Sequence, residues 1–193
     1  MKRRKEGDAI RIITRLLLGC ALSALFVFPV HAGPPEGALK GVLNATYMIE
    51  EQAVPLVDGR AEVQPAPGSA IKITTVVFAK PAYGDLNHDG RDDAALFLMH
   101  DPGGSGTFYY VAAAIADVDT YGGTNAVLLG DRVFPRTIHI RNGVIVAEFE
   151  DRKPDQPMAV APSIRKTMHF MLIEGYLTAV KHPDAMRKEQ NTP

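Results

Sequence analysis

The chain has 193 residues, a length that suits one domain, with 21 basic and 22 acidic side chains and a formal net charge of −1. It contains a single cysteine, Cys20, and no tryptophan. These counts exclude an internal disulfide framework and a cysteine-ligated zinc site. They also argue against a carbohydrate site built on stacked tryptophan rings.

The first 32 residues have the features of a secretory signal. Basic residues dominate positions 2–15, the apolar run LLLGCALSALFVFPV follows from Leu16 to Val30, and Val30-His31-Ala32 fits a signal peptidase site. The run is shorter than the roughly 20 apolar residues that a bilayer span needs. We therefore expect cleavage after Ala32, export to the periplasm or the medium, and no membrane span in the mature chain. Lipidation at Cys20 is an alternative that stays open.

Removal of this signal changes the charge and cysteine content of the protein. The signal holds 6 basic and 2 acidic residues, so the mature chain keeps 15 basic and 20 acidic residues and carries a net charge of −5. An acidic domain of this kind does not attract nucleic acid or anionic lipid, so we expect no nucleic-acid partner. A protein partner remains open. Without a thiol, the mature domain has to rely on its core or on a bound metal for stability.

Short β-like runs and turn signals alternate through the first half of the mature chain. Residues 33–42 read as a flexible lead-in, and Asp58-Gly59 predicts a hairpin turn between the runs 54–57 and 61–63. Residues 71–79 are rich in β-branched side chains, which favour strands. Residues 94–99, AALFLM, form a continuous apolar run typical of a buried strand. Residues 107–116 predict a strand, although an alanine triplet leaves a helix open.

Two further hairpins are predicted in the second half. Asn142-Gly143 separates the runs 136–141 and 144–150, and this dipeptide is a strong hairpin signal. Side chains alternate between the two faces of a strand. Ile138 and Ile140 therefore share one face of the first strand, and Ile145, Ala147 and Phe149 share one face of the second. Glu174-Gly175 separates a last pair of runs, and residues 181–193 form a polar tail.

The spacing of these runs predicts an all-β fold. We expect a mostly antiparallel sheet of about nine short strands, arranged as a sandwich or an open barrel with little helix, within residues 43–180. A closed propeller is excluded, since the chain is short and has no internal repeat.

The stretch YGDLNHDGRDD concentrates acidic residues, whose carboxylates would repel one another unless a cation bound between them. Counting Asp85 as position 1 gives the pattern D-x-N-x-D-G-x-x-D, which matches a calcium loop. Ca²⁺ takes about 6–8 oxygen ligands, and alternate positions of a wrapping chain turn their oxygens inward. The predicted ligands are the side chains of Asp85, Asn87, Asp89 and Asp93 and the backbone carbonyl of Arg91. Gly90 permits the sharp turn between them.

This loop resembles the strand-loop-strand calcium loops of FG-GAP and VCBS-like repeats, whose ligands occupy positions 1, 3, 5, 7 and 9. A helix-loop-helix hand would need glutamate at position 12, where this chain has Leu96. Those families carry several copies and build propellers, whereas this chain has one copy, so their adhesive function does not carry over.

A wider segment, from about Tyr83 to Met158, resembles a family of small exported bacterial proteins of unassigned activity. Its motifs here are GDLNHDGRDDAALFL, GGSGTFYYVAAAI, NAVLLGDRV, IRNGVIVAEF and PDQPM. The resemblance implies an exported bacterial β domain and no particular chemistry.

The predicted function is that of an exported, calcium-stabilised β domain that acts as a non-enzymatic binding or envelope-associated module. One alternative is a secreted hydrolase that uses the carboxylates of Asp85, Asp89 or Asp93 as acid and base. Another is a solvated acidic turn without an ion. Outside the loop, the pairs His100-Asp101 and Asp131-Arg132 are weaker candidates for a binding surface.

Overall fold

The structure is a computed structural model that describes residue 34 and residues 37–181. The predicted signal, its cleavage site, Cys20 and residues 182–193 of the polar tail lie outside the described residues. The described residues all belong to one compact unit, Ala32–Pro193. None of the helices in this part of the chain is long and apolar enough to cross a membrane.

The described residues form one short helix and twelve strands, and every pairing between two of these strands is antiparallel. The elements are α1 (Ala38–Leu43), β1 (Thr46–Ile49), β2 (Gln52–Pro55), β3 (Arg60–Val63), β4 (Ile73–Gly84), β5 (Asp93–Asp101), β6 (Phe108–Ala116), β7 (Tyr121–Gly123), β8 (Val127–Asp131), β9 (Phe134–Arg141), β10 (Val144–Asp151), β11 (Ile164–Ile173) and β12 (Tyr176–Val180). The predicted all-β fold is confirmed, with more strands than expected.

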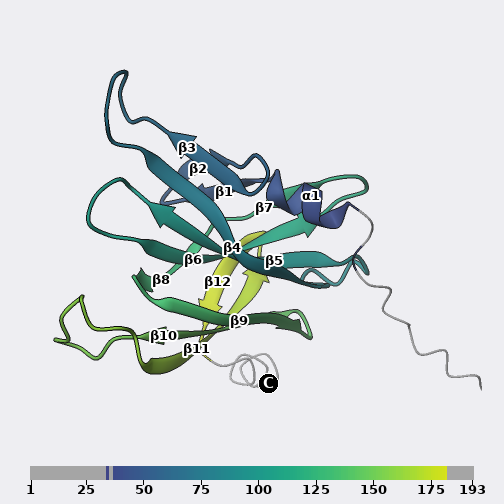
Figure 1. The fold of residues 1–193 in the computed structure, drawn as a ribbon. Helices are drawn as coiled ribbons and strands as arrows, with labels where there is room; N and C mark the ends of the chain where they lie inside the picture. The colour runs from purple at the N-terminus through teal and green to yellow at the C-terminus, as the bar shows by residue number, and fades with distance from the viewer. Residues whose placement is uncertain (1–33, 35–36, 182–193) are drawn as a thin grey trace, which may run out of the picture. The chain divides into compact units, whose positions relative to one another are not determined.

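The strands form three sheets (Figure 1). The small sheet pairs β1 with β2. The central sheet has the order β3-β4-β5-β6-β7, with β8 also paired to β6. The outer sheet has the order β12-β11-β10-β9. No sheet of the described residues closes into a barrel, and of the two predicted forms they adopt the sandwich.

The central sheet is buried on both faces, which explains the apolar run in β5. Leu96 and Leu98 point into a core shared with the small sheet and α1, where Tyr47 is fully buried. Phe97, between them in sequence, points into a second core shared with Ile145 and other residues of the outer sheet. A strand between two layers needs apolar side chains at both odd and even positions, and residues 94–99 supply them.

Residues 124–126 connect all three sheets. The N–H of Met48 donates to the carbonyl of Thr124 at 3.0 Å, and the N–H of Ala126 donates to the carbonyl of Met48 at 2.7 Å. The side-chain amide of Asn125 bonds both backbone groups of Leu177 in β12, at 2.9 and 2.8 Å. One amide therefore satisfies backbone groups at the edge of the outer sheet that would otherwise lack a partner.

Most of the predicted strands are present, with two differences near the N-terminal end. Part of the segment predicted as a flexible lead-in, 33–42, is helical, because Ala38 and Val42 pack their side chains into the core as α1. Asp58-Gly59 does form a tight turn with positive φ at both residues, but only one bridge, between Val57 and Arg60, closes it. Strands β2 and β3 instead pair with β1 and β4.

Residues 108–116 form strand β6, which settles the ambiguity left by the alanine triplet. Its alanines lie on both faces of the central sheet, where small side chains let the neighbouring layers approach. The hairpin at Asn142-Gly143 and the predicted inward faces of its two strands are also confirmed, with Ile138, Ile140, Ile145 and Ala147 in one core.

Candidate metal loop

The acidic stretch forms the connection between β4 and β5, at one end of the central sheet. Gly84 ends β4, and Asp93 is already the first residue of β5. The turn needs left-handed backbone at two positions, since φ is +63° at His88 and +84° at Gly90. Glycine adopts this conformation without strain, whereas a β-carbon at His88 disfavours it. The connection is therefore a tight turn of defined geometry.

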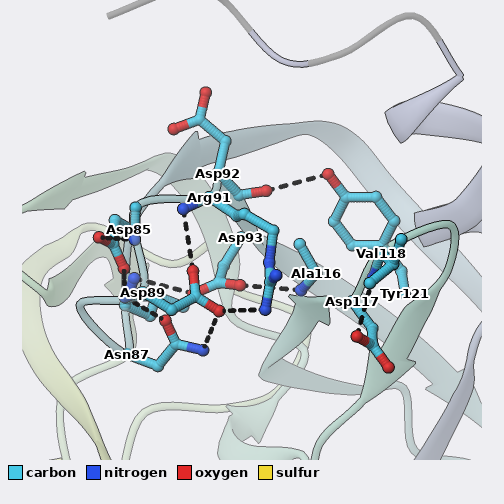
Figure 2. Close-up of polar contacts among 12 residues, drawn as sticks. Asp85, Asn87, Asp89, Arg91, Asp92, Asp93, Ala116, Asp117, Val118 and Tyr121 are labelled. Carbon is cyan, nitrogen blue, oxygen red and sulfur yellow. Dashed lines mark hydrogen bonds and ion pairs between the residues drawn. The ribbon is translucent and has the colours of Figure 1, made fainter.

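The three side chains at positions 1, 3 and 5 gather on one side of this turn (Figure 2). The N–H of Asp89 donates to both Asp85 Oδ1 at 3.2 Å and Asn87 Oδ1 at 3.0 Å. The other oxygen of Asp85 accepts from the N–H of Gly90 at 2.9 Å. Asn87 Nδ2 donates to Asp89 Oδ2 at 3.0 Å. Oxygens from Asp85, Asn87 and Asp89 therefore share one small network of hydrogen bonds.

Arg91 binds the carboxylate of Asp89 with both its backbone and its side chain. Its N–H donates to Asp89 Oδ1 at 2.9 Å, and its Nη2 lies 2.6 Å from Asp89 Oδ2. These contacts, the backbone N–H first, hold the pKa of Asp89 below its usual value. This ion pair is an addition to the role predicted for Arg91, which involves its backbone carbonyl only.

Asp93 differs from the other acidic residues because it is fully buried. Its Oδ2 accepts from the N–H of Leu86 at 2.9 Å, and its Oδ1 accepts from the N–H of Ala116 at 2.8 Å. Burial raises the pKa of Asp93, the two N–H donors lower it, and the nearby charges of Asp89 and Asp85 raise it further. This carboxylate therefore fastens the loop to the end of β6, and each oxygen retains a lone pair for one more contact.

Strand β7 and the β9–β10 turn also hold the loop. The hydroxyl of Tyr121 in β7 donates to the carbonyl of Asp92 at 2.9 Å, while the carboxylate of Asp92 points away from the group (Figure 2). The ring of His88 lies directly over Gly143, where a β-carbon would come within 2.9 Å of it. The loop therefore touches the central sheet and the β9–β10 turn of the outer sheet.

The predicted ligand residues are close together, but their present arrangement is not that of a formed metal site. Within residues 37–181, no three His, Cys, Asp or Glu side chains are grouped so that they could hold a metal ion as they stand. The physical reason lies in the contacts above: Asp89 faces Arg91, and Asp93 faces two backbone donors. The donor set itself, three carboxylates, an amide oxygen and a carbonyl, is one that suits Ca²⁺.

The other sequence candidates have structural partners. His100 Nδ1 lies 2.9 Å from Thr75 Oγ1, a hydroxyl on the neighbouring strand. Asp131 pairs with Arg132 at 3.0 Å and accepts from the N–H of Thr107 at 2.9 Å, so it joins the β5–β6 and β8–β9 connections. The loop 102–107 therefore reads as a fixed turn between strands.

The contacts that join this loop to strands distant in sequence could not be predicted from the sequence. The bonds from Ala116 to Asp93 and from Tyr121 to Asp92 span 23 and 29 residues. No local pattern encodes such pairs. The position of Asp93 is a weak signal for its burial. Asp93 directly precedes the apolar run 94–99, and a residue at the start of a buried strand is itself buried.

Comparison with known proteins gives no assignment. No protein family model matches the chain, and neither the curated proteins nor the solved structures give a match. The function is therefore argued from the residues and their geometry.

Proposed function

We propose that this chain is an exported, calcium-stabilised β domain that acts as a non-enzymatic binding or envelope-associated module. One observation carries the calcium part: Asp85, Asn87 and Asp89 already share a network of hydrogen bonds within one turn. Their spacing is also that of calcium loops of the FG-GAP and VCBS type. An ion bound on this side of the turn would be within reach of oxygens from positions 1, 3 and 5.

Binding of Ca²⁺ would require one rearrangement of the loop, at Asp89. Asp89 would turn from the guanidinium of Arg91 toward the ion, and this costs little because an ion pair exposed to solvent contributes little to stability. Asp93 would keep its two backbone donors and offer a second lone pair. The carbonyl of Arg91 would complete the set from the backbone.

The hydrolase alternative is less well supported by the same geometry. Its best acid would be the carboxyl whose pKa is raised, and that is Asp93. Asp93 is fully buried, however, and both of its oxygens bond backbone N–H groups. A general acid has to reach the substrate, directly or through one water, and a buried carboxyl held by two backbone donors is poorly placed for that.

The calcium part is tested by Asp89→Ala, with Asp119→Ala as the matched control. Asp119 lies in the adjacent β6–β7 turn. Its substitution by alanine removes the same charge as Asp89→Ala, but outside the loop. We expect Asp89→Ala to lower the melting temperature in calcium buffer and to leave it nearly unchanged in EGTA. Equal shifts for the two variants in calcium would mean that the loop binds no ion.

The export part is tested by the mass of the protein recovered from the periplasm of a bacterial host. We expect a mature chain that begins at Gly33, because cleavage is predicted after Ala32. A protein that stays in the cytoplasm with Met1 intact would contradict export.

A further inference from the structure

A cavity outside the acidic loop lies at the other end of the outer sheet, where β10 continues into β11. The twelve-residue connection 152–163 folds beside the strand ends and forms an open cavity of about 620 Å³ with them. Sites for small molecules have volumes of roughly 300–1,000 Å³, so this cavity is of the right size. It does not touch any residue of the loop 85–93.

Among the described residues, two cations that line this cavity form no direct ion pair, although the charge of Arg152 helps to lower the pKa of both Asp131 and Asp151. The carboxylates of Asp131 and Asp151 are each paired, with Arg132 at 3.0 Å and with Lys166 at 2.6 Å. Within residues 37–181, Arg152 and Lys153 make no ion pair. Of the lining carboxylates, only Asp155 is likewise unpaired.

Backbone carbonyls hold the guanidinium of Arg152 in place. Its Nε donates to the carbonyl of Val160 at 2.6 Å, and its Nη1 donates to the carbonyl of Arg132 at 2.8 Å. Its Nη2 makes no hydrogen bond to any described residue. Arg152 is thus a fixed cation whose Nη2 group is available to donate hydrogen bonds. The ammonium of Lys153 provides three further N–H donors.

Apolar side chains stay exposed around the same cavity. Met158 and Ile164 line it, and they are 48% and 37% exposed. Val160 lies on the same connection, and Phe134 starts β9 opposite Glu150, at the same end of the sheet. Covering these side chains with an apolar ligand is favourable by about 25 cal/mol per Å² of apolar surface removed from water.

We propose that this cavity binds a small amphipathic organic anion, a carboxylate or sulfonate on an apolar body. The anionic group lies against Arg152 Nη2 and the ammonium of Lys153, and the apolar body lies against Met158 and Ile164. Asp131 and Asp151 oppose it little, since Arg132 and Lys166 already pair with them, and the two cations outnumber Asp155, the one unpaired carboxylate among the described lining residues. The proposal gives the domain a ligand site and is independent of calcium at the acidic loop.

The first test uses the purified protein and the fluorescent probe 8-anilinonaphthalene-1-sulfonate, displaced by decanoate. We expect saturable binding, and Lys153→Glu should weaken it roughly tenfold or more, since it replaces a charge-assisted donor by a repelling acid. The matched control is Lys40→Glu, which makes the same charge change at an exposed position of α1. Equal weakening in both variants would overturn the proposal, because only net charge would then matter.

The second test needs no variant and locates the ligand. Addition of decanoate to isotope-labelled wild-type protein should shift the backbone amide resonances of residues 151–166 and leave those of residues 85–93 in place. The shifts should be the same in calcium and in EGTA. Amide shifts confined to other elements, or none at millimolar decanoate, would overturn the site while leaving the calcium proposal untouched.

Discussion

At the scale of single residues, Asp93 and Asp89 have different physical roles although both belong to the acidic motif. Asp89 is an exposed carboxylate whose partners all lie within its own turn. Asp93 is a buried carboxylate that satisfies backbone donors from two separate elements. One residue is therefore free to respond to an ion, and the other is needed for the fold with or without it.

We predict that Asp93→Ala lowers the free energy of unfolding in EGTA as well as in calcium. Its loss leaves the N–H groups of Leu86 and Ala116 buried without an acceptor, at a cost of about 1–3 kcal/mol for each group. Denaturant unfolding should therefore show a loss of roughly 2–6 kcal/mol without calcium, and more with it. A loss seen only in calcium would mean that Asp93 serves the ion alone.

At the scale of elements, strands and turns could be predicted where adjacent residues in the sequence carry the signal. The turn at Asn142-Gly143 and the strands around it could be predicted because a dipeptide and two alternating runs lie side by side. Strands β7 and β8 could not be predicted, since Gly122, Gly123 and Gly130 interrupt their patterns. At Gly123 the glycine is required by close packing, because a β-carbon there would lie 2.2 Å from the carbonyl oxygen of Thr46.

The cross-strand pair of His100 and Thr75 gives the central sheet a dependence on pH. Burial lowers the pKa of His100, although the charges of Glu50 and Asp101 oppose that shift. An unfolded chain then binds more protons than the folded one once the pH falls below about 6.5, the ordinary histidine value. Stability from this residue is thus complete at higher pH and is lost as the pH falls through that region.

We predict that His100→Gln reduces the dependence of unfolding free energy on pH between about pH 5 and 7. The pKa of His100, followed by NMR in the wild-type protein, should lie below its value in an unfolded peptide. A value above that of the peptide would reverse the sign and contradict the account. The lowered pKa values of Asp131 and Glu150, held by their arginine partners, act at lower pH, where those carboxylates gain protons.

At the scale of the whole molecule, the described domain is three antiparallel layers without a disulfide, and the acidic loop lies where layers meet. Asp93 connects it to β6, Tyr121 connects it to β7, and His88 packs over the turn between β9 and β10. An ion bound there would stiffen contacts between sheets as well as the turn itself. At about 100 times its dissociation constant, such an ion would stabilise the fold by roughly 2.7 kcal/mol.

The most direct test is a calorimetric titration of the chelator-treated, purified protein with Ca²⁺. The account predicts one saturable site with a dissociation constant of roughly 10⁻⁴–10⁻³ M, the range of extracellular calcium modules. It also predicts that the site disappears in Asp89→Ala and persists in Asp119→Ala. The absence of any binding heat at millimolar Ca²⁺, together with identical melting curves in calcium and EGTA, would contradict it.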